Sequence, residues 1–273
     1  MLTILPDLEA AYPPAPAAHF DLAEALRNGW IEFWYQPIID LRKKHLVGIE
    51  AFPRAHHPQL GVLMPGAFMA SAAAADLIAL SEQALTQGLE ANAGFAKLGG
   101  SLQLALNIPI GALTKIAVTD IVQTYRPRFE AWPGLIVGLT EKDIVNDLAL
   151  AGDMAKELKA IDVQLAVDDC GRGCSTLEEL KELPFAALKL HSAFVGDCAK
   201  DKINAAMCRT VIELAHSFGS IAIGTGIEKA ADALALVGMG CDYGQGFLLG
   251  RPMPEERFTA LLCQRAASQT DRV

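Results

Sequence analysis

The sequence predicts an α/β protein that folds as one TIM-like (β/α)8 barrel. Two observations carry this prediction: short β-rich runs alternate with helical stretches, and several of the runs end in a polar residue. Strands that alternate with helices favour parallel β/α units. α/β barrels commonly use about 250 residues as one domain, and the chain has 273. About eight strands in a chain of this length favour a closed barrel over a doubly wound sheet. Periodicity alone does not decide between the two.

The expected strands are short runs rich in β-branched, aromatic and other apolar residues. Between them lie stretches with apolar residues three and four positions apart, such as 147–161 and 203–218, which are typical of amphipathic helices. The strands are expected at residues 33–39, 45–52, 101–108, 134–140, 163–169, 187–191, 220–226 and 241–247.

The domain organisation expected from the sequence is simple. Residues 1–19 end in the run PPAPAA and are expected to form a flexible N-terminal arm. Residues 20–262 form the barrel domain, and residues 263–273 form a C-terminal tail. Whether the arm docks on the barrel is left open.

Charge and hydropathy exclude several classes of function. The net charge is −9, with 32 acidic against 23 basic residues, so sequence-independent nucleic-acid binding is not expected. No stretch reaches the roughly 18 apolar residues that a membrane helix needs. The N-terminus lacks the basic segment of a signal peptide. These features lead us to expect a cytoplasmic protein that binds neither nucleic acid nor membranes.

Six cysteines are present, without the CxxC spacing of many metal sites. In a cytosolic chain of this size they are expected to be reduced core or surface residues. The pair Cys170 and Cys174 leaves a metal or redox role open.

Polar residues at the ends of apolar runs predict a functional site. The carboxyl ends of barrel strands ring one mouth, where residues far apart in sequence converge. One such aspartate alone could be a helix N-cap, but a set on successive strands favours a shared site. The set is Asn107, Asp168, Asp169, Lys189 and Gln245.

Several ordered segments within residues 20–258 give the chain a family resemblance. They are YQPI (35–38), EAFPR (50–54), the pattern His57-Pro58, Gly61, Pro65 and Phe68, then Asn107, Thr140-Glu141, DDCGRG (168–173), Lys189, GCDYGQGF (240–247) and RPMP (251–254). Together they resemble the EAL family of cyclic di-GMP phosphodiesterases, with Phe52 in place of the family's leucine. The resemblance implies an EAL-type barrel that binds cyclic di-GMP, a bacterial second messenger, across its strand ends.

The resemblance also implies a metal centre, because active members use two divalent ions to hydrolyse cyclic di-GMP to pGpG. Such ions are held through oxygen ligands and activate a water molecule. By position, Glu50, Asn107, Asp168 and Asp169 are the expected metal ligands, and Glu50 and Lys189 are vestigial catalytic residues. Two further acids of the family are replaced, by Gly138 and by Thr225. The site is therefore incomplete and expected to be weak or empty, so no cofactor is required and Mg or Mn matters only for residual activity.

Residues on the ligand side of the family site are better preserved. Gln36 can offer its amide to a guanine edge, and the planar fork of Arg54 suits a phosphate or guanine. His191 replaces a family aspartate, either as a nitrogen ligand or, as the simpler interpretation, as a hydrogen-bonded structural residue. The expected ligand-binding residues are Gln36, Phe52, Arg54, Asp169, Lys189, Glu228, Gln245, Pro252 and Met253.

Three functions follow as hypotheses. The first is a degenerate EAL domain that acts as a catalytically impaired cyclic di-GMP receptor or signalling module. The second is a slow phosphodiesterase that gives pGpG, and the third is a protein-interaction module that binds no nucleotide. A homodimer is expected because Glu141 and the loop after Asp168 resemble the family's dimerisation region, and a protein partner is left open.

Overall fold

The computed structural model describes residues 20–128, 132–171, 180–181 and 183–270. The N-terminal arm, residues 271–273 of the expected tail, and the positions of Arg172 and Cys174 lie outside these ranges. Within the ranges, no helix combines the length and the apolar character needed to cross a lipid bilayer.

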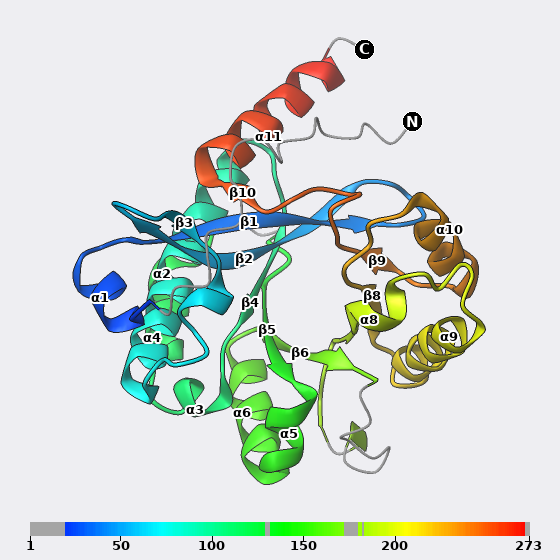
Figure 1. Cartoon of the computed structure of the whole chain (residues 1–273), viewed down its shortest axis with the longest axis horizontal. Coiled ribbons are helices and arrows are strands. Elements are labelled where there is room, and N and C mark those ends of the chain that lie inside the picture. Colours follow the sequence, from blue (N-terminus) through cyan, green and yellow to red (C-terminus); the bar gives the residue numbers. More distant parts are fainter. Residues whose placement is uncertain (1–19, 129–131, 172–179, 182, 271–273) are drawn as a thin grey trace.

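Eight strands close into a barrel, which confirms the fold class (Figure 1). Hydrogen-bonded neighbours follow one another around the barrel, and β1 closes it by pairing with both β2 and β9. Each expected strand is present. The barrel strands are β1 (Ile31–Asp40), β2 (Leu46–His57), β4 (Gln103–Asn107), β5 (Leu135–Thr140), β6 (Val163–Cys170), β7 (Ala187–Leu190), β8 (Ile221–Gly224) and β9 (Tyr243–Gly244), with β3 (Gly61–Leu63) and β10 (Met253–Pro254) at the margins.

The first strand departs from the expected parallel pattern, since β1 runs antiparallel to both of its barrel neighbours. The reason lies in the short link between β1 and β2, which has no room for a crossover helix. Asp40 fixes this turn, because its carboxylate accepts hydrogen bonds from the backbone N–H groups of Arg42 and Lys43. Lys44 completes the turn with a φ of 57°. The sequence expectation of parallel units is therefore wrong for β1.

Helices surround the barrel (Figure 1). The expected helices at 147–161 and 203–218 are found as α6 and α9. The last helix continues past residue 262, where the sequence placed the end of the barrel domain. The helices are α1 (Leu22–Arg27), α2 (Ala74–Lys97), α3 (Ile110–Leu113), α4 (Val118–Tyr125), α5 (Glu141–Asn146), α6 (Leu148–Ala160), α8 (Ser192–Val195), α9 (Lys202–Ser217), α10 (Ala230–Met239) and α11 (Glu255–Thr270), with a 3-10 turn at Pro65–Ala67.

Two apolar clusters hold the fold together. The larger one packs the outer face of the sheet against the helices. The smaller one is a layer inside the barrel, to which six strands each contribute one buried side chain. Its members are Ile38, Ala105, Ile136, Ala166, Ala187 and Ile223.

The described cysteines are free thiols, as expected from the sequence. Burial raises the pKa of the Cys170 thiol to about 12, with the nearby Glu141 carboxylate adding to the effect. A thiol with such a pKa is protonated at neutral pH and is a poor nucleophile or metal ligand.

Candidate functional site

The site begins one layer above the apolar layer inside the barrel. Residues two positions apart on a strand share a face. The residues that lie two positions nearer the mouth than each member of that apolar layer therefore also point into the barrel. Glu50 joins them, because it is the register partner of Gln36 across β1 and β2. This polar layer contains Gln36, Glu50, Asn107, Gly138, Asp168, Lys189 and Thr225.

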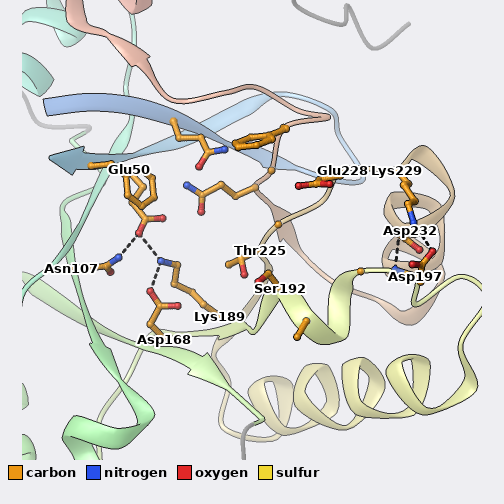
Figure 2. A pocket seen from close by; sticks show the side chains of 18 residues that line it. Glu50, Asn107, Asp168, Lys189, Ser192, Asp197, Thr225, Glu228, Lys229 and Asp232 are labelled. Atoms are coloured by element: carbon orange, nitrogen blue, oxygen red, sulfur yellow. Dashed lines mark hydrogen bonds and ion pairs between the residues drawn. The ribbon is translucent and has the colours of Figure 1, made fainter. Parts of the chain in front are cut away.

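A pocket of about 610 Å3 opens above this layer (Figure 2). The inner end of the pocket is the polar layer, and the outer end is formed by α8, the start of α10 and the loops around them. The pocket is lined by Gln36, Glu50, Phe52, Asn107, Asp168, Lys189, Ser192, Ala193, Gly196, Asp197, Thr225, Gly226, Glu228, Lys229, Asp232, Gln245, Gly246 and Phe247.

An ion triad occupies the inner end. The ammonium nitrogen of Lys189 lies 2.8 Å from Glu50 Oε1 and 2.8 Å from Asp168 Oδ2. Burial alone would lower the pKa of Lys189, but the two carboxylates more than offset this and raise it above its usual value. The lysine therefore remains charged and acts as the counter-ion of both acids.

Asn107 adds a fourth member to this network and fills the space above Gly138. Its side-chain amide donates a 2.8 Å hydrogen bond to Glu50 Oε1. A Cβ atom at position 138 would lie only 2.3 Å from Asn107 Oδ1. The present position of Asn107 therefore depends on glycine at 138.

Neither Gly138 nor Thr225 supplies a carboxylate. The Thr225 hydroxyl donates a 2.6 Å hydrogen bond to the backbone carbonyl of Leu190, so the backbone already engages it. Across the described residues, no group of three or more His, Cys, Asp or Glu side chains is arranged to hold a metal ion. The residues present do not fit a two-ion centre, because the Lys189 ammonium already bridges two of the expected acidic ligands. One donor atom remains available, since Glu50 Oε2 is buried and has no hydrogen-bond partner.

A profile of the EAL domain matches residues 20–252. The chain belongs to the EAL domain family. Among its relatives is the cyclic di-GMP phosphodiesterase RocR of Pseudomonas aeruginosa, 32% identical over 92% of this chain and 64% of RocR. The bifunctional diguanylate cyclase/cyclic di-GMP phosphodiesterase MucR of the same organism is 31% identical over 88% of this chain and 36% of MucR. This EAL domain thus spans only part of both relatives.

Solved structures agree with this assignment. The solved structure of the Pseudomonas aeruginosa MucR phosphodiesterase in complex with c-di-GMP superposes on this chain with a TM-score of 0.79 at 29% identity. The match covers 87% of this chain and 97% of that one. The EAL enzyme Bd1971, in a form bound to cAMP and cyclic di-GMP, gives a TM-score of 0.80 at 25% identity, over 88% of this chain and 67% of that one.

The structure brings most of the predicted metal-side residues of this EAL domain together. Glu50 and Asp168 belong to the triad, and Asn107 donates a hydrogen bond to Glu50. Asp169 does not line the pocket, and its side chain is 52% exposed. Asp169 has a φ of 57°, and its backbone N–H donates to Asp168 Oδ1 at 2.8 Å.

His191 behaves as a structural residue of the helix that follows β7. Its Nδ1 atom accepts a 3.1 Å hydrogen bond from the backbone N–H of Ala193 and so caps α8. Its Nε2 atom lies 3.8 Å from Asp169 Oδ1.

Five of the predicted ligand-binding residues line the pocket. Gln36 donates to the Gly250 carbonyl at 2.9 Å, which leaves its own carbonyl oxygen for other contacts. The Gln245 side-chain nitrogen is buried without a partner, so it is a donor that a ligand acceptor could satisfy. The five are Gln36, Phe52, Lys189, Glu228 and Gln245.

Arg54 lies outside the lining of the pocket. Its guanidinium stacks 5.2 Å from the ring centre of Trp34, and its Nη1 atom donates to the Pro53 carbonyl at 2.8 Å. Burial lowers the pKa of Arg54 to about 10. Pro252 and Met253 are also outside the lining, and Met253 is part of the larger apolar cluster. A role for these three in ligand binding stays a prediction.

Sequence reasoning missed the outer wall of the pocket. Lys229 Nζ lies 2.6 Å from Asp197 Oδ1, while the buried Asp232 accepts hydrogen bonds from the backbone N–H groups of Asp197 and Ala199. Phe247 lines the same end. For Lys229 and Phe247 the only sequence signal was adjacency, because Lys229 follows Glu228 and Phe247 ends a segment already identified. Asp197 and Asp232 had no such signal.

Proposed function

We propose that this EAL domain is a catalytically impaired cyclic di-GMP receptor. One observation carries the proposal: Lys189 bridges Glu50 and Asp168 at 2.8 Å each, while the positions that would add carboxylates hold Gly138 and Thr225. The Lys189 ammonium engages one oxygen of each carboxylate, so two metal ions would compete with it for these ligands. The chemistry that active relatives carry out is therefore expected to be lost.

The ligand side of the pocket supports retention of binding. A pocket of about 610 Å3 is large enough for a sizeable ligand. It carries a buried, unpartnered donor on Gln245, which a ligand oxygen would satisfy. The relatives named for cyclic di-GMP and the c-di-GMP complex of the MucR domain point to the same ligand.

The test is a calorimetric titration of the full chain with cyclic di-GMP in Mg²⁺, followed by analysis of the mixture for pGpG. Saturable binding without pGpG supports an impaired receptor. Gly138→Glu/Thr225→Glu restores both acids, and a gain of pGpG formation in this double variant would attribute the impairment to those positions. Rapid turnover by the unaltered chain would refute the proposal.

A second candidate is a slow phosphodiesterase. The buried, unpartnered Glu50 Oε2 favours it, because that atom could accept one cation. Slow pGpG formation in Mn²⁺ or Mg²⁺, abolished by Glu50→Ala, would establish this activity.

The proposal also includes a homodimer in the cytoplasm. Light scattering of the purified chain tests the dimer, and fractionation of cells tests the location. If no cyclic di-GMP binding is found and a protein co-purifies with the chain, the third hypothesis, a protein-interaction module, takes its place.

A further inference from the structure

A second cavity lies at the opposite end of the barrel from the pocket. Its volume is about 900 Å3, and it shares no lining residue with the pocket. Its lining includes Gly134, Val163 and Ala186, which lie at or just before the first residues of β5, β6 and β7. Parallel strands begin at the end of a barrel that is opposite to their carboxyl ends. We call this the basal cavity, and the barrel strands separate it from the site described above.

The floor of the basal cavity is apolar. Ala155 on α6 and Val163 and Leu165 on β6 line the cavity, and each is no more than 2% exposed. Two aromatic side chains, Trp132 and Phe185, also line it and are only partly buried. Such a lining favours a ligand that carries an apolar ring system.

Contacts outside the basal cavity hold both aromatic side chains in place. The indole nitrogen of Trp132 donates a 2.8 Å hydrogen bond to Asn92 Oδ1, and the Asn92 amide donates to the Leu102 carbonyl at 3.1 Å. The ring of Phe185 packs edge-on against that of Phe218, with ring centres 5.3 Å apart. The aromatic part of the lining is therefore preformed, so little side-chain entropy would be lost on binding.

Cations gather at the opening of the basal cavity. Arg126, Arg128 and Lys159 line it and are exposed, and Asp162 is the one acid of the described lining. Within the described part of the chain, none of these three cations forms an ion pair with an acid. Three positive groups and one negative group give a local charge of +2, in a chain with a net charge of −9. The opening therefore attracts an anion, and the planar guanidinium groups suit a carboxylate or a phosphate.

We propose that the basal cavity binds an organic anion that carries an aromatic ring system, such as an aryl phosphate or an aromatic carboxylate. The ring lies on the apolar floor beside Trp132 and Phe185. The anionic group meets Arg126, Arg128 and Lys159 at the opening. This site goes beyond the proposed function and does not depend on it, because the two sites have no lining residue in common.

The test is a calorimetric titration of the full chain with 1-naphthyl phosphate as the probe. Two matched compounds separate its parts: 1-naphthol has the ring without the charge, and inorganic phosphate has the charge without the ring. We expect saturable binding of the probe with a Kd below about 1 mM, and weaker binding of both matched compounds. Binding of the probe should weaken between about 50 and about 300 mM NaCl, because the cations are exposed.

Two variants locate the probe on the molecule. Arg126→Gln/Lys159→Gln removes two charges from the opening and is expected to weaken binding about 2- to 30-fold, the sum of two exposed charge pairs. Lys156→Gln is the matched control, because Lys156 is an exposed lysine of the same helix, α6, and does not line the cavity. The control should bind the probe as the parent chain does. Circular dichroism and thermal melting show that each variant retains the fold.

Four results would overturn the proposal. The first is the absence of saturable probe binding in that concentration range. The second is unchanged affinity in Arg126→Gln/Lys159→Gln, which would place the probe elsewhere. The third is an equal loss in the control, which would show a general effect of charge. The fourth is binding of either matched compound as tightly as the probe, which would show that ring and charge are not read together. None of these results involves cyclic di-GMP, so the proposed function would stand in each case.

Discussion

At the scale of single residues, the pocket is organised by a lysine that serves as an internal counter-ion. Lys189 is 4% exposed and Glu50 1% exposed, so their charges are tolerated only because they are paired. Breaking such a buried pair leaves an uncompensated charge in a low-dielectric environment. Removal of the lysine therefore makes a sharp test of the triad.

Lys189→Met is expected to reduce the free energy of unfolding by about 3–5 kcal/mol at pH 7, measured by urea denaturation. In the variant, Glu50 and Asp168 lose their counter-ion and remain as buried carboxylates without a cationic partner. The raised pKa of Lys189 itself keeps its contribution constant across neutral pH.

The control for this prediction is Lys156→Met, which breaks an exposed pair with Asp153. We expect it to cost no more than about 1 kcal/mol. A similar small cost for Lys189→Met would show that the triad is not a buried ion network.

Gly138→Ala probes the dependence of Asn107 on glycine. The added Cβ would meet Asn107 Oδ1 at 2.3 Å, so the amide must move and its bond to Glu50 is lost. We expect a loss of about 1–3 kcal/mol in thermal or urea unfolding, the usual cost of overpacking. Gly152→Ala in α6 is the control, because nothing lies within 4 Å of a Cβ there. It is expected to stabilise by about 0.4–1 kcal/mol, and equal effects of the two substitutions would contradict the argument.

At the scale of elements, the outer wall of the pocket depends on one buried carboxylate. Asp232, on α10, accepts the N–H groups of Asp197 at 3.1 Å and Ala199 at 3.0 Å. It therefore fastens the connection between α8 and α9 to the start of α10. Without it, two donors of that connection have only water as a partner.

Asp232→Ala is expected to reduce the free energy of unfolding by at most about 1.5–3 kcal/mol for each charge-assisted hydrogen bond that is lost. The backbone amides of residues 197 and 199 should then exchange hydrogen faster. Hydrogen–deuterium exchange with mass spectrometry measures this. Asp153→Ala, which removes an exposed acid from α6, is the control and should leave those amides unchanged. Unaltered protection in Asp232→Ala would show that other contacts hold the connection.

The elements also show how far the sequence could predict this molecule. All barrel strands were identified, because buried strands are short apolar runs bounded by polar residues. The direction of β1 was missed, since periodicity carries no direction, although the short link after Asp40 implied a hairpin. Of the inner triad, Asp168 and Lys189 were predicted because polar residues at strand ends are rare in a pure core, whereas Glu50 was predicted only from the family resemblance. The outer wall was not, because Asp197, Lys229 and Asp232 resemble the charged residues of any helix or loop.

At the scale of the whole molecule, charge sets how a ligand reaches the pocket. The chain has a net charge of −9, and the pocket lining carries five carboxylates against two ammonium groups, a net charge of −3. A dianionic ligand such as cyclic di-GMP is repelled at long range, and salt screens this repulsion.

The association rate for cyclic di-GMP is therefore expected to rise as NaCl increases from about 50 to about 300 mM, by stopped-flow measurement. This sign is opposite to that of a basic phosphate-binding site. The substitution Asp197→Asn should weaken the dependence of the association rate on salt, because Asp197 lines the pocket. Asp153→Asn, on α6 and outside the pocket lining, should weaken it less. A rate that falls with salt would show that local positive charge dominates the encounter.

The barrel is closed by a short seam. β9 consists of Tyr243 and Gly244 and pairs with β1 through two residue pairs, Ile39 with Gly244 and Asp40 with Tyr243, whereas β1 and β2 pair along nearly their full length. The pairing of β9 with its other neighbour, β8, also comprises two residue pairs, so local opening of the barrel should start beside β9. Gln36 on β1 and Gln245 and Phe247, just after β9, all line the pocket. A molecule bound there would therefore contact both strands of this pairing and oppose their separation. Ligand binding would then slow the local opening of the barrel.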